Sequence, residues 1–316
     1  MGNIYVYHHN DHDGIVAAGV LYHFLLRNDY YSVVFNMIDY QTKLNFDHID
    51  FNDDDEIFFL DYSFSNNENL EEFRKLLERR ITGYEVTWID HHKTSIGVLE
   101  EYGIPGIRTK GLCGAALTYI YTANSMYDPE ITDEELSERF HNNEKIPLFL
   151  KYIDDYDCWK HIYTETNDFH YGLTVSDPKD EIISNLLNTY DECTSSNYTK
   201  QEIIRSIIST GKEIQNYLKF ENKEYHIKMY GFEYTLPEEH GGYKCFCINR
   251  KGNSHMFGDK IEEYDAVIPF YFNGSRWTYS MYTEKDNVDC EAVAKSFGGG
   301  GHLKAAGWTS DKLLFE

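Results

Sequence analysis

Short apolar segments alternate with helical patterns through the first half of the chain, and this alternation limits the possible folds more than any other feature. Expected strands cover residues 4–7, 32–38, 57–60 and 86–89, and expected helices cover 14–26, 69–80, 115–123 and 134–153. Strands separated by helices are typical of a mostly parallel sheet, because parallel strands need a crossover connection. Ligands bind such sheets at the carboxyl ends of the strands. The sequence therefore predicts an α/β domain whose functional site lies at that edge.

Histidine and aspartate residues gather where these strands, and the last of these helices, end. The clusters are His9, Asp11 and Asp13; Asp61; Asp90, His91 and His92; and Asp154, Asp155 and Asp157. If the first strand continued past its apolar part, its three alternate ligand-type residues would share one face. An unpaired buried carboxylate is costly, so this many at one edge indicate bound cations.

The types of side chain narrow the choice of cation. Carboxylate and imidazole groups together suit Mn²⁺, Mg²⁺, Co²⁺ or Fe²⁺ better than a thiolate-seeking metal. The clusters hold too many ligands for one ion. Two ions about 4 Å apart, bridged by a carboxylate, form the arrangement that activates water for attack on phosphorus. The pattern thus predicts a two-metal phosphoesterase.

The second half of the chain predicts another, smaller α/β domain. A polar, amphipathic helical pattern covers residues 198–224, and the expected strands after it are 225–230, 245–249, 266–272 and 277–282, with a short helix over 290–296. These patterns divide the chain into a metal-binding domain over 1–195, a helical linker over 196–224 and a second domain over 225–316.

Four consecutive glycines, residues 298–301, stand immediately before His302. Glycine lets the backbone approach a ligand closely and present its N–H groups to a phosphate or a nucleotide end. His302 adds a side-chain donor, and the small residues over 305–307 indicate tight packing behind the run. We therefore expect Gly299, Gly300, Gly301 and His302 to bind substrate.

The formal net charge of −24 limits the partners that the protein can bind. A protein that follows a long polyanion usually carries a basic stripe, because neutralising phosphates supplies much of its affinity. This chain would repel long DNA or RNA over most of its surface, whereas bound metal ions can concentrate positive charge in one cleft. We expect short oligonucleotides or nucleotides as ligands, and no long duplex DNA.

The six cysteines form no Cys-x-x-Cys pair, so we interpret them as small buried apolar residues and not as a zinc site or a disulfide framework. No apolar run reaches the roughly 18 residues that a membrane span needs. The first residues also lack the basic and apolar regions of a signal peptide. These features predict a cytoplasmic protein that does not enter a membrane.

Five segments together resemble the motifs of the DHH phosphoesterase family, in the family's order along the chain. They are Tyr7-His8-His9-Asn10-Asp11-His12-Asp13-Gly14, Leu60-Asp61-Tyr62-Ser63, Ile89-Asp90-His91-His92-Lys93, Tyr152-Ile153-Asp154-Asp155-Tyr156-Asp157-Cys158-Trp159, and the glycine-rich segment 298–307. The last is similar to the signature of the DHH-associated domain, which implies that the second domain holds the end of the substrate away from the scissile bond.

The resemblance implies a role for each matching residue. His9 and Asp11 would bind one metal ion, Asp13, His91 and Asp155 the other, and Asp61 would bridge them, with Mn²⁺ as the expected ion and Mg²⁺ or Co²⁺ as alternatives. Asp154 and Asp157 remain alternatives to Asp155. Asp90 would orient a histidine, and His92 would contact the substrate phosphate or the leaving oxygen.

One position departs from the family pattern. Relatives often carry a Ser-x-Arg-Ser strand before the glycine run, with arginine on a phosphate, whereas this chain has Tyr282 at that place. Tyr282 weakens the expectation of a phosphate clamp and favours stacking on a base.

Several activities are compatible with these residues. The acidic surface and the compact two-domain size favour a nanoRNase-like exonuclease on short oligonucleotides, of either polarity, which also takes 3′-phosphoadenosine 5′-phosphate. A RecJ-like exonuclease on long single strands is one alternative, although it needs a basic channel. Hydrolysis of cyclic or linear dinucleotides is another, and a catalytically inactive nucleotide-binding protein is a third.

Overall fold

The computed structural model describes residues 2–27, 32–47, 49, 51–64, 67–79, 84–123, 126–176, 197–221 and 230–315. Contacts divide the chain into two compact units, Met1–Lys212 and Glu213–Glu316. The division falls within helix α8 (Asn197–Glu221), inside the segment expected to be a helical linker. The limits of the three expected segments stay predictions, because residues 177–196 and 222–229 lie outside the described residues.

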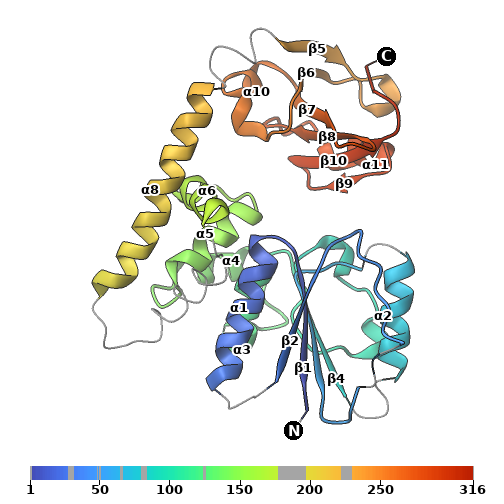
Figure 1. Ribbon diagram of the computed structural model, residues 1–316, viewed down its shortest axis with the longest axis vertical. Helices are drawn as coiled ribbons and strands as arrows, with labels where there is room; N and C mark the ends of the chain where they lie inside the picture. Colours follow the sequence, from blue (N-terminus) through green and yellow to red (C-terminus); the bar gives the residue numbers. More distant parts are fainter. Residues whose placement is uncertain are drawn as a thin grey trace. The chain divides into compact units, whose positions relative to one another are not determined.

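The first unit is built on a four-stranded parallel sheet (Figure 1). Its strands are β1 (Ile4–His9), β2 (Val33–Ile38), β3 (Glu56–Leu60) and β4 (Glu85–Ile89), in the order β2-β1-β3-β4. All three pairings are parallel, so the carboxyl ends of the strands meet at one edge. The expected parallel α/β architecture is confirmed.

Helices cover both faces of this sheet, with α1 and α3 on one side and α2 on the other (Figure 1). Their bounds are α1, His12–Arg27; α2, Asn67–Arg79; and α3, Gly114–Ala123. Successive residues of a strand point to opposite faces. Phe58 and Leu60 of β3 accordingly pack in the core under α1 and α3, while Ile57 and Phe59 pack in the core under α2.

The prediction of a single helix over residues 134–153 is wrong, because the structure has two helices there. These are α4 (Asp133–Asn142) and α5 (Leu148–Asp157). Pro147 precedes α5, and proline lacks a backbone donor and disfavours helical geometry in the residue before it. A further helix, α6 (Thr166–Val175), was not expected from the sequence.

The second unit contains a mixed six-stranded sheet in the order β5-β6-β7-β8-β10-β9. The strands are β5 (Gly231–Thr235), β6 (Lys244–Asn249), β7 (Ala266–Phe272), β8 (Trp277–Tyr282), β9 (Gly300–Gly301) and β10 (Ala305–Ser310). Among the described strands of this sheet, only the β6–β7 pairing is parallel. The described part of this unit also contains two short α-helices, α10 (Lys260–Glu263) and α11 (Cys290–Ser296).

Most expected elements of the second unit are present, and three strands were missed. The expected strand over 225–230 lies almost entirely outside the described residues, and β5, β9 and β10 were not expected. The five described cysteines are free and four of them are buried, as expected, while Cys193 lies outside the described residues. In the described part of the chain, no helix is both long enough and apolar enough to cross a membrane.

Candidate metal centre

The connection from β1 to α1 brings three ligand-type side chains together. His9 ends β1, Asp11 lies in the turn and Asp13 lies in the first turn of α1, so the three do not share one strand face. His9 Nδ1 is 2.7 Å from Asp11 Oδ2, and Gly14 N donates to Asp11 Oδ1 at 2.9 Å. A Cβ on Gly14 would lie 2.3 Å from the His9 carbonyl oxygen, so only glycine allows so tight a turn.

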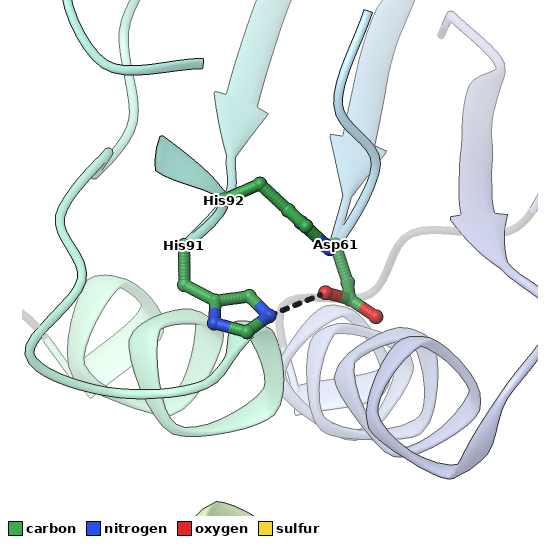
Figure 2. A group of neighbouring side chains, drawn as sticks. All are labelled: Asp61, His91 and His92. Carbon is green, nitrogen blue, oxygen red and sulfur yellow. Dashed lines mark ion pairs between the residues drawn. The ribbon is translucent and has the colours of Figure 1, made fainter. Parts of the chain in front are cut away.

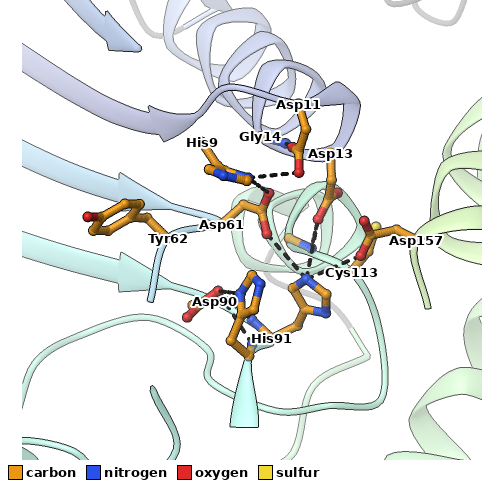
Figure 3. A network of polar contacts seen from close by, with 12 residues as sticks. His9, Asp11, Asp13, Gly14, Asp61, Tyr62, Asp90, His91, Cys113 and Asp157 are labelled. Atoms are coloured by element: carbon orange, nitrogen blue, oxygen red, sulfur yellow. Dashed lines mark hydrogen bonds and ion pairs between the residues drawn. The ribbon is translucent and has the colours of Figure 1, made fainter. Parts of the chain in front are cut away.

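Asp61 lies at the centre of the cluster, directly after β3 (Figure 3). Its side chain is 1% exposed, and neither carboxylate oxygen has a hydrogen-bond partner among the described residues. The nearest nitrogens are His9 Nδ1, 3.7 Å from Oδ2, and His91 Nε2, 3.2 Å from Oδ1. Its backbone φ of 54° is rare for a residue other than glycine, and such strain recurs at functional sites.

The imidazole of His91 faces carboxylates from three different elements. Its Nε2 lies 3.2 Å from Asp61 Oδ1, 3.2 Å from Asp157 Oδ2 and 3.8 Å from Asp13 Oδ2. Figure 2 shows His91 pointing at Asp61 from the end of β4. One nitrogen cannot hydrogen-bond to three carboxylates at once, so His91 alone does not balance the negative charge of this group.

Asp13 is held by the amino end of α3. Gly114 N donates to its Oδ2 at 2.6 Å, and Ala115 N donates to its Oδ1 at 2.7 Å. The exposed N–H groups and the dipole of a helix amino end both favour a negative charge there. A Cβ on Gly114 would lie 2.6 Å from Asp61 Cβ and 3.1 Å from Asp13 Oδ2. Glycine at this position therefore allows both carboxylates to lie against the helix. This role of Gly114 was not expected from the sequence.

The structure places the three carboxylates at the end of α5 in different surroundings. Asp155, the sequence-based choice, points away from the cluster and accepts hydrogen bonds from Ile162 N, Tyr163 N and Thr166 Oγ1. Asp157 Oδ2 instead faces His91 and accepts no hydrogen bond among the described residues. Of the three carboxylates, Asp157, one of the two alternatives left open, is thus the one that faces His91, and the choice of ligand among them stays a prediction.

Asp154, the other alternative, belongs to a buried network behind the cluster. Lys160 Nζ donates to its Oδ2 at 2.6 Å, and His141 Nε2 lies 2.7 Å from the same oxygen. Cys113 N, at the start of α3, donates to Oδ1 at 2.7 Å. Burial opposes ionisation of Asp154, but these partners lower the pKa of its carboxyl group. Asp154 thus stabilises the helix end that holds Asp13.

Asp90 contacts both of the histidines that follow it. Asp90 Oδ1 accepts a hydrogen bond from His91 N at 2.9 Å and lies 2.8 Å from His92 Nδ1, and Ser95 Oγ donates to Oδ2. The other ring nitrogen, His92 Nε2, lies 3.2 Å from the hydroxyl of Tyr40. Tyr40 was not expected at the site from the sequence, although this residue follows β2 at the same edge of the sheet.

The electrostatics of the cluster show that it attracts positive charge. Burial and the neighbouring Asp61 carboxylate raise the pKa of Asp157 to about 7, and the same two causes raise the pKa of Asp13. Burial opposes protonation of His9, but the neighbouring Asp11 and Asp61 carboxylates outweigh it and raise its pKa to about 10. Burial also opposes ionisation of Asp61, yet the facing His9 and His91 keep its pKa below the usual range.

The geometry of these groups fits divalent cations. His9, Asp11 and Asp61 bring ligand atoms within 4.8 Å of one another, and Asp61 forms a further group of this kind with His91 and His92. Asp61 is thus shared between groups: its Oδ2 faces His9, its Oδ1 faces His91, and neither oxygen accepts a hydrogen bond from the described residues. Cys158 lies near His91 and Asp157, but burial raises the pKa of its thiol to about 12, so the cluster offers oxygen and nitrogen ligands.

In the second unit, the glycine run forms a tight hairpin. Gly300 and Gly301 pair with Gly307 and Ala306 of β10, and a Cβ on Gly299 would lie 2.1 Å from the Gly307 carbonyl oxygen. Gly300 has no atom near its Cβ position, so packing does not require a glycine there. His302 is exposed, and Tyr282 is half-buried at the end of β8. Their role in substrate binding stays a prediction.

Comparison with known proteins shows what the first unit resembles. Residues 3–141 match the family model described as DHH family, N-terminal domain. The match includes most of the buried histidine and aspartate cluster, so this part of the chain is similar to the metal-dependent phosphoesterases of that family.

Particular relatives are similar to nearly the whole chain at low identity. The chain is 24% identical over 331 residues to Oligoribonuclease NrnB of Bacillus subtilis (strain 168), covering 99% of this chain and 74% of the relative. The crystal structure of RecJ from Thermus thermophilus in complex with Mn²⁺ matches 99% of this chain and 50% of that one, with 16% identity and a TM-score of 0.52. A second structure, exonuclease RecJ bound to manganese, covers 99% and 87%, with 15% identity and a TM-score of 0.51.

Proposed function

We propose that the protein is a two-metal phosphodiesterase that hydrolyses short oligonucleotides from one end. The observation that carries this proposal is Asp61, a buried carboxylate with two unpartnered oxygens between two groups of ligand-type side chains. Leaving such oxygens unsatisfied would cost about 1–3 kcal/mol or more, so a cation between them is the simplest explanation.

The ligand assignment follows from which side chains meet. His9 and Asp11 would hold one ion, Asp13, His91 and Asp157 the other, and Asp61 both. Ions bound in this way neutralise charge on the substrate phosphate and activate water for the attack. Mn²⁺ is the ion we favour, since mixed imidazole and carboxylate ligands suit it and both RecJ structures are described with manganese.

The remaining residues of the centre act on the substrate. Asp90 accepts the Nδ1 hydrogen of His92, which leaves Nε2, beside the Tyr40 hydroxyl, for the substrate. There His92 contacts an oxygen of the scissile phosphate or the leaving oxygen. Asp90 also makes the imidazole a better proton carrier, because a carboxylate partner stabilises the charged ring.

A short substrate is favoured by charge. Each added nucleotide brings another phosphate, and outside the centre that phosphate meets a protein of net charge −24. The Bacillus subtilis relative is named as an oligoribonuclease, and its alignment covers 99% of this chain. We extend the proposal to 3′-phosphoadenosine 5′-phosphate, which offers the same phosphate chemistry on one nucleoside.

The test is hydrolysis of a dinucleotide, a pentanucleotide and a long single strand, as RNA and as DNA, with Mn²⁺ at low and moderate salt. Repulsion between exposed charges is screened beyond about 10 Å at 0.1 M salt. We therefore expect kcat/KM to be highest for roughly two to five residues and to recover partly on long strands as salt rises. Asp61→Ala, prepared identically, is the control for contaminating nucleases and should be inactive.

Other outcomes would overturn the proposal in distinct ways. Preference for the long strand, weakened by added salt, would indicate phosphate contacts along the chain and a RecJ-like exonuclease. Faster hydrolysis of a cyclic dinucleotide than of any linear substrate would indicate a cyclic-dinucleotide phosphodiesterase. Tight nucleotide binding without turnover in any divalent cation would indicate an inactive binding protein.

A further inference from the structure

Tyr40 lies at the same edge of the sheet as the metal-ligand cluster, two residues after β2 ends. Its ring stacks on the buried ring of Tyr62, with centroids 5.3 Å apart and an interplanar angle of 20°. The ring of His9 is tilted against the ring of Tyr40, with centroids 5.1 Å apart and an interplanar angle of 50°. Two aromatic contacts therefore hold a side chain that is still 40% exposed. A rigid aromatic ring beside a candidate metal ligand is in a position to act on that site.

The hydroxyl of Tyr40 completes a chain of polar groups. The chain begins at Asp90, which is fully buried, and passes from Asp90 Oδ1 to His92 Nδ1 over 2.8 Å. It continues from His92 Nε2 to the Tyr40 hydroxyl over 3.2 Å. With the carboxylate on Nδ1, Nε2 is the nitrogen that exchanges a proton or a hydrogen bond with other groups.

We infer that Tyr40 is a positioning residue for His92, and that its hydroxyl holds the ring in the orientation from which Nε2 meets the substrate oxygen. This inference rests on the proposed function of the metal centre. The substrate oxygen then takes the place of the hydroxyl at Nε2, because a ring nitrogen has only one hydrogen or one lone pair to offer.

The ring of His92 is held at both nitrogens. Asp90 holds Nδ1 and the Tyr40 hydroxyl holds Nε2, so the ring cannot turn without losing one of these contacts. A positioning contact acts on the alignment of the reacting groups, which places its effect on kcat more than on KM.

The variant that isolates this effect is Tyr40→Phe, because it keeps the ring stacked on Tyr62 and removes only the hydroxyl. A single neutral hydrogen bond is worth about 0.5–1.5 kcal/mol, so we expect kcat on a dinucleotide to fall roughly 3- to 10-fold with KM changed less than about 2-fold. The melting temperature and the Mn²⁺ affinity should stay at wild-type values. Tyr62→Phe is the matched control: it removes a hydroxyl bonded to Asn69 from the other ring of the stack, and its kcat should not fall.

A double-mutant cycle separates positioning from a general structural effect. If Tyr40 acts through His92, adding Tyr40→Phe to His92→Ala should cause no further loss of kcat. An equal loss in both backgrounds, or a Tyr40→Phe enzyme with wild-type kcat, would overturn the inference.

A measurement without turnover keeps this inference distinct from the proposed function. The ¹⁵N resonance of His92 Nε2 should shift between the wild type and Tyr40→Phe, because the atom loses a hydrogen-bond partner. An unchanged resonance would overturn the role of Tyr40 even in an active enzyme. A shifted resonance in a protein without phosphodiesterase activity would support the contact and refute the proposed function.

Discussion

Replacing Gly114 by alanine should disturb the metal centre while leaving the fold largely intact. The added Cβ would lie 2.6 Å from Asp61 Cβ and 3.1 Å from both Asp61 Cγ and Asp13 Oδ2. Ordinary carbon–carbon contacts are about 3.5–4.0 Å, so α3 or the carboxylates have to move by roughly 1 Å. Because Asp61 is the shared carboxylate and Asp13 is hydrogen-bonded to the same helix end, the displacement falls on both proposed ion positions.

The expected effects on stability and activity differ in size. Overpacking costs about 1–3 kcal/mol, and alanine recovers up to about 1 kcal/mol of helix propensity over glycine. A net loss of about 0–2 kcal/mol lowers the melting temperature of a unit of this size by less than about 8 °C. A misplacement of about 1 Å in a catalytic group can reduce turnover about 100-fold. We expect that reduction in kcat, together with weaker Mn²⁺ binding.

Three measurements check this prediction: dinucleotide hydrolysis with saturating Mn²⁺, calorimetric titration of Mn²⁺, and thermal unfolding of the metal-free protein. Thr122→Ala is the control at the other end of α3, where the hydroxyl bonds to the Thr118 and Tyr119 carbonyls of its own helix. It should keep wild-type kcat. A Gly114→Ala enzyme with kcat within about threefold of wild type and unchanged Mn²⁺ affinity would refute the reasoning, since overpacking of about 1 Å would then be absorbed elsewhere.

Further predictions concern the ligands and the second unit. A chelator should abolish activity and Mn²⁺ should restore it better than Ca²⁺, which prefers looser oxygen cages; full activity in metal-free protein would exclude the metal centre. Asp157→Asn should weaken Mn²⁺ binding and nearly abolish kcat. Asp155→Asn should instead lower the melting temperature and leave the Mn²⁺ affinity within about threefold of wild type, because Asp155 accepts hydrogen bonds from residues 162–166. The reverse pattern in titrations of the two variants would restore Asp155 as the ligand. His302→Ala should raise KM without changing metal content, measured by steady-state kinetics and elemental analysis, and a loss of metal at constant KM would contradict its placement on the substrate side.

The sequence by itself determined the architecture of the first unit and the edge at which the site lies. Apolar strands alternating with helical patterns specify a parallel sheet, and a parallel sheet brings its carboxyl ends together. His9 is the last residue of its strand, and Asp61 and His91 follow theirs by one and two residues, so their meeting follows from the topology. Such local patterns can be recognised in a sequence because they depend only on residues that are neighbours along the chain.

The tertiary structure decided which carboxylate at the end of α5 faces the cluster. Successive helical residues point about 100° apart, so Asp154, Asp155 and Asp157 look in different directions. Which direction leads to His91 depends on how α5 is rotated against α1 and α3, and that rotation is set by packing between segments far apart in the chain. The sequence therefore left three candidates, and the contacts single out Asp157.

The roles of Tyr40 and Gly114 could not be predicted from the sequence, for the same physical reason. Nothing near Tyr40 in the chain marks its hydroxyl as a partner of His92, 52 residues later. Gly114 begins a helix, where glycine has many uses, and only the distance to Asp61 shows that a side chain would not fit. Close approaches between distant segments arise when the helices pack on the sheet, so the finer geometry of this centre exists only in the folded chain.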